Sequence, residues 1–164
     1  MGLLVLAVPG RADEATAVKA IKKLGGVIIV DRQVAGEPIV GVYLISPSVK
    51  DEDLKELKEF KSVQTLNLSN TAVTDAGLKE LKGLKTLQML MLDHTKITSA
   101  GIKNLKGLKR LQLLDISANE VTDAWLRELK ELKNLQTLYL FGTKVTDAGV
   151  KELKAALPRL EILR

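Results

Sequence analysis

The one histidine of the chain, His94, directly follows Asp93. An imidazole beside a carboxylate is a pairing found in metal sites and in general acid–base catalysis. A zinc site needs three or four ligands, and a catalytic pair needs an oriented nucleophile. The chain has no cysteine, and Asp115 is the only further acid expected nearby, on an open, solvated face. The sequence therefore predicts no catalytic residue, no metal site and no cofactor.

His94 belongs to a segment that repeats. Segments beginning at residues 63, 87, 111 and 135 share one pattern, with a period of 24 residues and no gap. The first reads VQTLNLSNTAVTDAGLKELKGLKT and the second LQMLMLDHTKITSAGIKNLKGLKR. A fixed period in this range is typical of a solenoid, in which no repeat buries its apolar face alone. Function therefore depends on which repeat positions vary and face solvent.

Each repeat predicts a strand followed by a short helix. Leu66 and Leu68 alternate with polar residues, which indicates a strand with one buried face. Leu78 then points inward from a helix that we expect Thr74 to cap. One polar residue at each strand exit can satisfy backbone groups that would otherwise be buried and unpaired. This set comprises Thr71, Thr95, Asn119 and Thr143.

The same register extends the repeats in both directions. Counting back one period gives a degenerate first repeat, so five repeats occupy residues 39–158. Residues 13–38 predict a helix and a strand, which we expect to cap the first repeat. Residues 159–164 predict a capping sixth strand, in which Leu160 and Leu163 come one residue late.

The pattern LxxLxLxxTxVTDAGLxxLxxL resembles that of leucine-rich repeat proteins over roughly residues 39–164. Its threonine, at the usual asparagine or cysteine position, is most similar to bacterial repeats of secreted or surface proteins. The resemblance implies an α/β fold: a right-handed leucine-rich repeat solenoid, shaped as a curved arc. It also implies a parallel sheet on the concave side, short helices on the convex side, and protein interaction in place of catalysis.

Strand residues between the buried leucines should face the concave surface in three columns. The repeat at 63 shows small polar side chains there, whereas later repeats show apolar ones. Because exposed apolar patches usually mark interaction sites, we predict a protein or peptide partner. The predicted partner-binding residues are Tyr43, Met89, Met91, Asp93, His94, Leu113, Asp115, Tyr139 and Phe141. The alternative is that these side chains only shield the sheet or mediate self-association.

Two other features bear on binding. Trp125 replaces the glycine of other repeats, and we expect its indole to project outward. Lysines recur on the expected convex face, and the net charge is +5. This ridge could attract a nucleic acid or an acidic surface polymer. Interspersed glutamates and the lack of interleaved aromatic residues favour a solvated face instead. A purely structural spacer in a larger surface assembly is the third interpretation.

Residues 1–12 resemble the end of a secretory signal peptide. An apolar run over 3–8 precedes Pro9, and small residues suit cleavage after Ala12. The run is short and lacks the usual preceding basic residues. We expect export to the periplasm, the cell surface or the medium, or a cytoplasmic location if this segment is no signal remnant. No run approaches the ~20 apolar residues that span a bilayer.

Overall fold

The computed structural model describes residues 11–164, so the predicted leader lies outside the described residues except for its last two. Those two begin the N-terminal helix. In chain order the elements, with η for a 3-10 helix, are α1 (Arg11–Lys23), β1 (Val27–Val30), β2 (Ile39–Tyr43), η1 (Asp51–Glu59), β3 (Thr65–Asn67), η2 (Gly77–Gly83), β4 (Met89–Met91), η3 (Ile102–Asn104), β5 (Leu113–Asp115), α2 (Asp123–Leu129), β6 (Thr137–Tyr139), α3 (Asp147–Ala156) and β7 (Glu161–Leu163). None of the described helices has the length and apolar character to cross a membrane.

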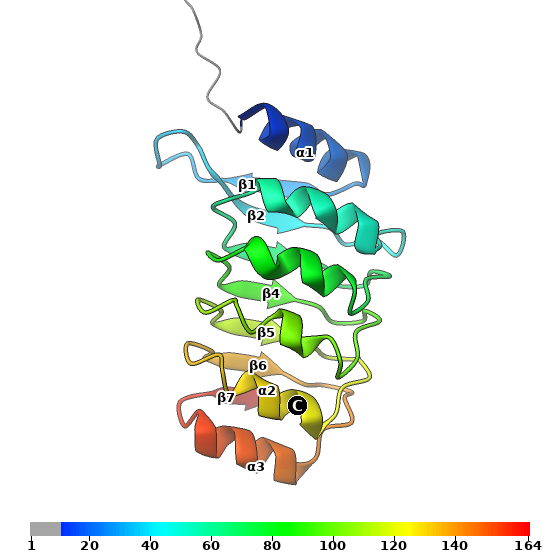
Figure 1. Ribbon diagram of the computed structural model, residues 1–164, viewed down its shortest axis with the longest axis vertical. Helices are drawn as coiled ribbons and strands as arrows, with labels where there is room; N and C mark the ends of the chain where they lie inside the picture. The colour runs from blue at the N-terminus through cyan, green and yellow to red at the C-terminus, as the bar shows by residue number, and fades with distance from the viewer. Residues whose placement is uncertain (1–10) are drawn as a thin grey trace, which may run out of the picture.

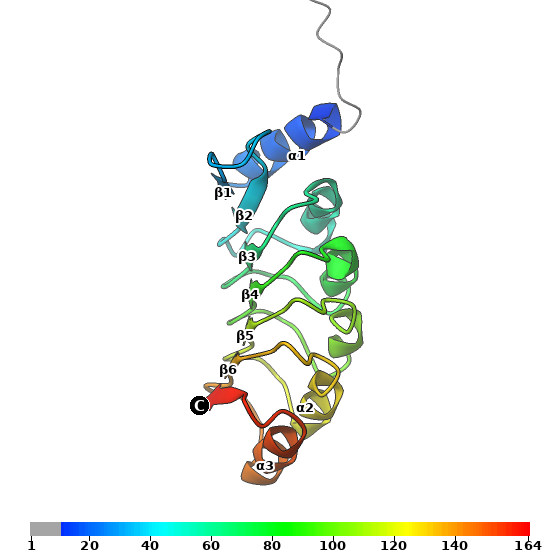
Figure 2. The ribbon, with the colours of Figure 1, turned by 90° about the vertical axis from the view of Figure 1, so that its left-hand side faces the viewer.

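Seven strands form one open sheet in the order of the chain. β1 runs antiparallel to β2, and all later neighbours are parallel. The repeats stack along the long axis of the molecule (Figure 1). The sheet lines the concave side of a shallow arc, and the helices line the convex side (Figure 2). The predicted α/β solenoid is confirmed, and the antiparallel β1 belongs with α1 to the N-terminal segment that covers the first repeat.

The sequence period is the register of the sheet. Gly41 pairs with Thr65, Thr65 with Met89, Met89 with Leu113, and Leu113 with Thr137. The ladder continues past the strands, where His94 donates its N–H to the carbonyl of Ser117 at 3.1 Å. Equivalent side chains therefore stack in columns, as the period predicts. The inward columns form one core along the whole solenoid, with Leu66, Leu90, Leu114 and Leu138 fully buried.

The chain turns at each strand exit, and a column of polar side chains, Thr71, Thr95, Asn119 and Thr143, stabilises these turns. The hydroxyls of Thr71, Thr95 and Thr143 each donate to the carbonyl three residues earlier, at 2.7 to 2.8 Å. Asn119 reaches further and donates to the carbonyl of Leu92, one repeat back, at 2.7 Å. The residue just before this column has a left-handed backbone in four repeats, with φ of 51° to 65° at Asn70, His94, Ala118 and Gly142.

The last strand differs from the sequence prediction. Glu161 pairs with Thr137, so β7 keeps the register of the other strands and is not late. The delay lies in the loop before it, where Leu160 is buried after the ten-residue helix α3. Compared with the loops of the other repeats, that loop has one residue more before its leucine and one residue fewer between the leucine and the strand. Ile162, and not Leu163, therefore packs against the core.

Trp125 also differs from the prediction, because its side chain is fully buried. The equivalent residues Gly77, Gly101 and Gly149 are glycines for a local reason. A Cβ at Gly101 would collide with the carboxylate of Asp75, and one at Gly149 would collide with that of Asp123. An aspartate of the preceding repeat thus leaves no space for a side chain at these positions.

These aspartates join each repeat to the next. Asp75 accepts hydrogen bonds from the backbone N–H of Thr98 at 2.8 Å and from its hydroxyl at 2.6 Å. Asp51 and Asp123 bind the next repeat in the same way. In the repeat before Trp125 the aspartate is replaced by Ser99, which accepts from the N–H of Thr122 at 3.2 Å. Because serine is shorter, this repeat can place a tryptophan where the others need glycine.

Candidate functional site

The register brings the predicted binding residues onto one face of the sheet. Asp115 lies directly between Met91 on β4 and Tyr139 on β6. Leu113 lies beside Met89 in the neighbouring column. The remaining members sit at the two ends of this surface or at the strand exits. We call the outward side chains of this sheet the concave face, and no helix of residues 11–164 covers it (Figure 2).

Five apolar side chains gather on the concave face around Asp115. Met89 is 39% exposed and Phe141 is 51% exposed, and the other three are half-buried. The rings of Tyr139 and Phe141 have centroids 6.4 Å apart, with planes tilted by 33°. We call this set the apolar strip; it comprises Met89, Met91, Leu113, Tyr139 and Phe141.

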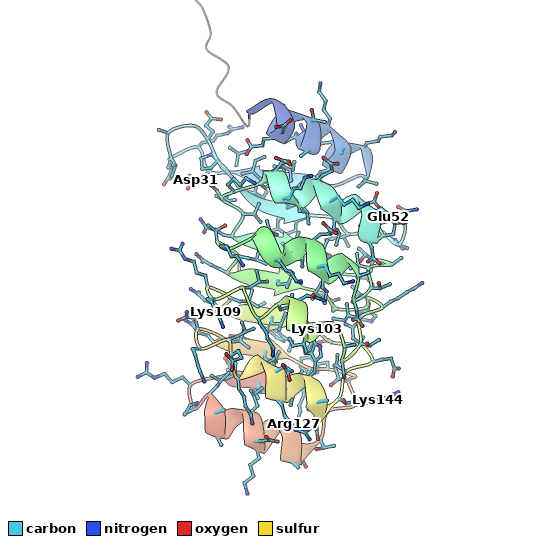
Figure 3. The ribbon with its side chains drawn as sticks, in the orientation of Figure 1. Asp31, Glu52, Lys103, Lys109, Arg127 and Lys144 are labelled. Atoms are coloured by element: carbon cyan, nitrogen blue, oxygen red, sulfur yellow. The ribbon has the colours of Figure 1, made fainter. Side chains whose placement is uncertain are left out.

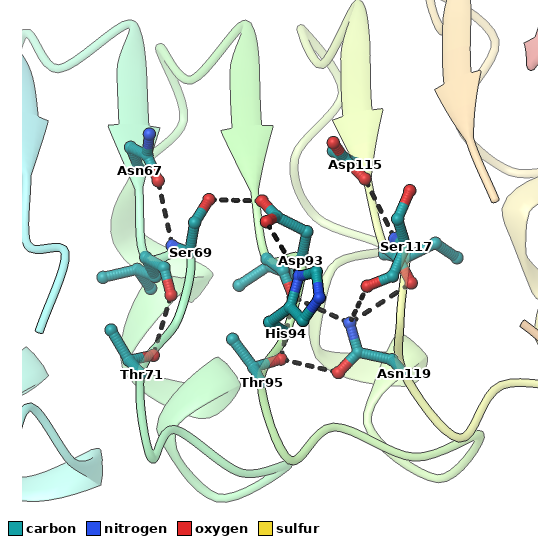
Figure 4. A network of polar contacts seen from close by, with 12 residues as sticks. Asn67, Ser69, Thr71, Asp93, His94, Thr95, Asp115, Ser117 and Asn119 are labelled. Atoms are coloured by element: carbon teal, nitrogen blue, oxygen red, sulfur yellow. Dashed lines mark hydrogen bonds and ion pairs between the residues drawn. The ribbon is translucent and has the colours of Figure 1, made fainter. Parts of the chain in front are cut away.

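Asp93 and His94 lie at the exit of β4, next to the apolar strip. The hydroxyl of Ser69 donates to one carboxylate oxygen of Asp93. The Nδ1 atom of His94 lies 3.3 Å from the other oxygen (Figure 4). His94 occupies one of the left-handed turn positions, and its side chain is 63% exposed. This pair can exchange hydrogen bonds with a ligand, but the described residues contain no group of three possible metal ligands.

Asp115 and Ser117 repeat part of this arrangement one strand further on. The backbone N–H of Ser117 donates to Asp115 at 2.9 Å, just as that of Ser69 donates to Asn67 at 2.9 Å. The hydroxyl of Ser117 is buried and has no hydrogen-bond partner within residues 11–164. Ser69 finds an acceptor in Asp93, whereas the residue that follows Ser117 in the same column is Phe141.

The comparisons with known proteins agree with this geometry. Leucine-rich repeat profiles match residues 85–145 and 61–82. A solved leucine-rich repeat protein of Leptospira interrogans is 29% identical, with a TM-score of 0.53. The match covers 66% of this chain and 27% of the Leptospira protein. The chain is a leucine-rich repeat protein.

Two more distant structures share the fold of this leucine-rich repeat protein. Actin-binding site 2 of leiomodin-1 is 21% identical, with a TM-score of 0.59, and the match covers 88% of this chain and 87% of that one. The PEPR1-AtPEP1 structure is 18% identical, with a TM-score of 0.55, and the match covers 93% and 24%. At these identities both show the fold alone. No curated protein matches the chain.

The leucine-rich repeat protein also exposes apolar residues that the sequence interpretation did not include. Val27 and Ile29 pair with Tyr43 and Gly41, so β1 extends the concave face by one strand. Val27 is 56% exposed and Ile45 is 53% exposed. Together with Tyr43, which is among the predicted binding residues, Val27, Ile29 and Ile45 form what we call the N-terminal apolar patch. The short β-branched run over residues 27–30 predicts a strand, but no sequence signal fixes its antiparallel pairing with β2.

Among residues 11–164, some of the convex lysines are paired and others are not. Towards the C-terminus they form ion pairs between neighbouring repeats: Lys106 with Glu128, Lys109 with Glu131, and Lys130 with Glu152 at 2.6 Å. The hydrogen bond and charge of Lys130 lower the pKa of Glu152, and those of Glu128 raise the pKa of Lys106. Lys103 and Arg127 both lie on this helix-bearing side (Figure 3).

The middle of the solenoid lacks such pairing. The residues 22 positions after Lys106 and Lys109 are glutamates, whereas those 22 positions after Lys82 and Lys85 are Asn104 and Gly107. Within residues 11–164, four exposed lysines of this middle region have no carboxylate partner. We call them the unpaired lysines; they are Lys79, Lys82, Lys85 and Lys103.

Proposed function

We propose that this leucine-rich repeat protein is a non-enzymatic interaction module that binds a protein or peptide through its concave face. The observation that supports this proposal is the apolar strip, which lies exposed on a sheet face that no described helix covers. Both the strip and the N-terminal apolar patch lie on this face, separated by the small polar residues Thr65, Asn67 and Ser69. The leucine-rich repeat family supports a role in protein interaction.

The chemistry of the strip suits a protein contact. Burying apolar surface is the main favourable contribution to most protein–protein association, because it removes that surface from water. Aromatic side chains such as Tyr139 and Phe141 are enriched among the residues that dominate binding energy. The flexible thioethers of Met89 and Met91 adapt to irregular partner surfaces. The open face also leaves the Asp93–His94 pair in contact with water, which does not favour catalysis.

The test removes the apolar strip without touching the core. We expect Met91→Ser combined with Tyr139→Ser to reduce capture of a partner from the native source by at least about tenfold, because two central contacts are lost. The readout is the amount of each partner retained on the immobilised variant and identified by mass spectrometry. Urea denaturation shows whether the fold persists.

The matched control removes apolar surface from the other end of the same face. Val27→Ser combined with Ile45→Ser should leave capture of that partner unchanged if the strip is the site. Loss of capture in the control alone would move the site to the N-terminal apolar patch. Full capture by both variants would exclude the concave face.

A second candidate function rests on the unpaired lysines. They could hold a polyanion on the convex face through release of its counterions. The ion pairs of Lys106, Lys109 and Lys130 leave the lysines of η2, η3 and their loops as the cluster we consider for this surface. Retention on immobilised heparin at increasing salt, compared between variants of the two faces, separates it from concave-face binding.

A further inference from the structure

The two faces of the solenoid differ in charge. The outward positions of β2 to β6 and their exits carry two carboxylates, Asp93 and Asp115, and no lysine or arginine. Elsewhere the carboxylates commonly pair with cations, as Glu120 does with Lys144 and Glu131 with Lys109. Neither Asp93 nor Asp115 has a lysine or arginine partner among the described residues. The concave face is therefore acidic on a chain whose net charge is +5.

The two carboxylates are close enough to serve one cationic group. They lie on neighbouring strands, two residues apart along the strand direction, because Asp115 pairs with Met91. Strand spacings of about 4.8 Å and a rise of about 3.3 Å per residue put their α-carbons about 8 Å apart. Each aspartate has one oxygen occupied by a strong internal donor, Ser69 for Asp93 and the N–H of Ser117 for Asp115.

The remaining acceptors differ between the two aspartates. His94 lies 3.3 Å from the second oxygen of Asp93 and competes for it. The second oxygen of Asp115 has no hydrogen-bond partner within the described part of the chain. Asp115 is therefore the main anchor for a cation, and Asp93 adds to the local negative charge.

Ser117 provides a second, independent sign of a ligand. Its side chain is only 9% exposed, and its hydroxyl has no partner within residues 11–164. The side chain lies beside the Asp115 carboxylate (Figure 4). A buried hydroxyl without a partner destabilises the structure, so a ligand that donates a hydrogen bond here recovers this loss. Phe141, the half-exposed neighbour in the same column, would have to turn aside to admit it.

The neighbours of Asp115 favour arginine over lysine. Tyr139 pairs with Asp115 across β5 and β6, so its ring borders the carboxylate. A guanidinium can bind a carboxylate through two hydrogen bonds and stack its plane on an aromatic ring, which an ammonium cannot do. Met91 borders Asp115 on the other side and offers apolar surface to the residues next to that arginine.

We propose that the concave face binds a peptide segment that carries one arginine between apolar side chains, with the arginine on Asp115 and stacked on Tyr139. The inference rests on the proposed function and specifies the chemistry of its partner. It follows from the charge of this face, the unpartnered Ser117 hydroxyl and the register that places Asp115 between Met91 and Tyr139.

The test is selection of a random dodecapeptide display library on the full chain. We expect the enriched peptides to share an arginine flanked by apolar residues. Synthetic copies should bind at least about tenfold more weakly to Asp115→Asn, because the amide carries no charge to pair with the guanidinium. Replacing the peptide arginine by lysine should also weaken binding severalfold. The matched control, Glu120→Gln, removes a carboxylate outside the face and should not change affinity.

The outcomes separate this inference from the proposed function. Peptides that lose binding to the Met91→Ser, Tyr139→Ser variant but lack arginine, or ignore Asp115→Asn, would overturn the arginine assignment and leave concave-face binding intact. Peptides that bind this double variant normally would count against both. A selection without enrichment over the same double variant would also contradict both. Urea midpoints equal to that of the parent chain exclude misfolding as the cause of a loss.

Discussion

Ser99 and Trp125 depart together from the residues found in the other repeats. Asp75 and Asp123 each bind a threonine of the next repeat. Each also leaves room only for glycine at the position of that repeat that is equivalent to Trp125. Ser99 keeps hydrogen bonds to both the N–H and the hydroxyl of Thr122, at 3.2 and 3.1 Å, and leaves space for the larger residue. The two exchanges therefore compensate each other, and each alone should be harmful.

A double-mutant cycle tests this compensation. We expect Ser99→Asp alone to destabilise the protein by about 1–3 kcal/mol, because the added carboxylate meets the Cβ of Trp125. Trp125→Gly alone should cost about 3–5 kcal/mol through the cavity it leaves. In the Trp125→Gly background, Ser99→Asp should be neutral or stabilising, giving a coupling of about 0.5–3 kcal/mol. Urea denaturation of the four proteins measures it.

The control variant adds the same charge at the residue that follows Ser99. Ala100→Asp places a carboxylate on an exposed neighbour of Ser99 and should change stability by less than about 0.5 kcal/mol in either background. Additive effects of Ser99→Asp and Trp125→Gly would show that the two sites are independent.

The sequence predicts the position of a side chain when that position follows from the repeat period alone. It does not when the position depends on contacts between repeats. The columns that contain Met91 and Tyr139 follow from the period alone, because identical repeats in a parallel sheet must stack in register. Trp125 could not be placed in this way. Its burial depends on Ser99, and the space that Ser99 leaves becomes visible only when the aspartate–threonine contacts between repeats are known.

At the scale of elements, each aspartate–threonine contact ties the start of one helical segment to that of the next. Asp123, the first residue of α2, accepts from both the hydroxyl and the N–H of Thr146, which precedes α3. These hydrogen bonds, from the hydroxyl first and then the N–H, hold the pKa of Asp123 below its usual range. The charged form is thus favoured in the folded state.

This contact makes the last repeats sensitive to acid. A folded pKa below the unfolded value of about 4 means that the contribution of Asp123 is complete above pH 4 and is lost as the pH falls through the folded pKa. We expect the urea midpoint of the parent chain to drop between pH 5 and pH 3 by more than that of Asp123→Asn. At pH 7 the variant should already be less stable, because the amide nitrogen cannot accept from Thr146.

The comparison needs an exposed carboxylate that makes no hydrogen bond to a neighbouring repeat. Glu37 lies exposed in the loop between β1 and β2, so Glu37→Gln should keep the acid response of the parent. If Asp123→Asn also keeps that response, the contact with Thr146 does not contribute to acid sensitivity.

The terminal elements α1, β1 and β7 are predicted less completely than the repeats. The helix and the strand of residues 13–38 were predicted, and α1 and β1 are present. The direction of β1 was not predicted, because a strand outside the repeats has no period to fix its partner. The apolar residues Val27 and Ile29 were therefore missed on the concave face. The position of Leu160 predicts a last strand that is one residue late, but the extra residue belongs to the loop before β7.

At the scale of the whole molecule, the solenoid separates its charges between two faces. The concave face carries acidic and apolar side chains, and the convex face carries the lysines. Cross-repeat ion pairs neutralise part of the convex charge, whereas the unpaired lysines cluster over η2 and η3. A polyanion would thus bind a restricted region on the opposite side from a peptide, and the two proposed activities can be separated by mutation.

Retention on immobilised heparin tests the convex surface. If the unpaired lysines form a site, the protein should be retained at about 50 mM salt and released by about 200 mM, because each neutralised anion contact adds to the salt dependence. Lys82→Glu with Lys85→Glu should elute at clearly lower salt than the parent. Lys106→Glu with Lys109→Glu makes the same change in net charge but removes lysines that already pair with Glu128 and Glu131, so its shift should be smaller.

The two lysine variants and the apolar variant together show which face of the protein binds heparin. Equal shifts of the two lysine pairs would mean that heparin responds to net charge, with no localised site. Retention that ignores salt, or no retention at 50 mM, would exclude the polyanion function. The Met91→Ser, Tyr139→Ser variant should elute like the parent, because its substitutions lie on the other face of the sheet. Earlier elution of that variant would place the anion on the concave face, which its carboxylates oppose.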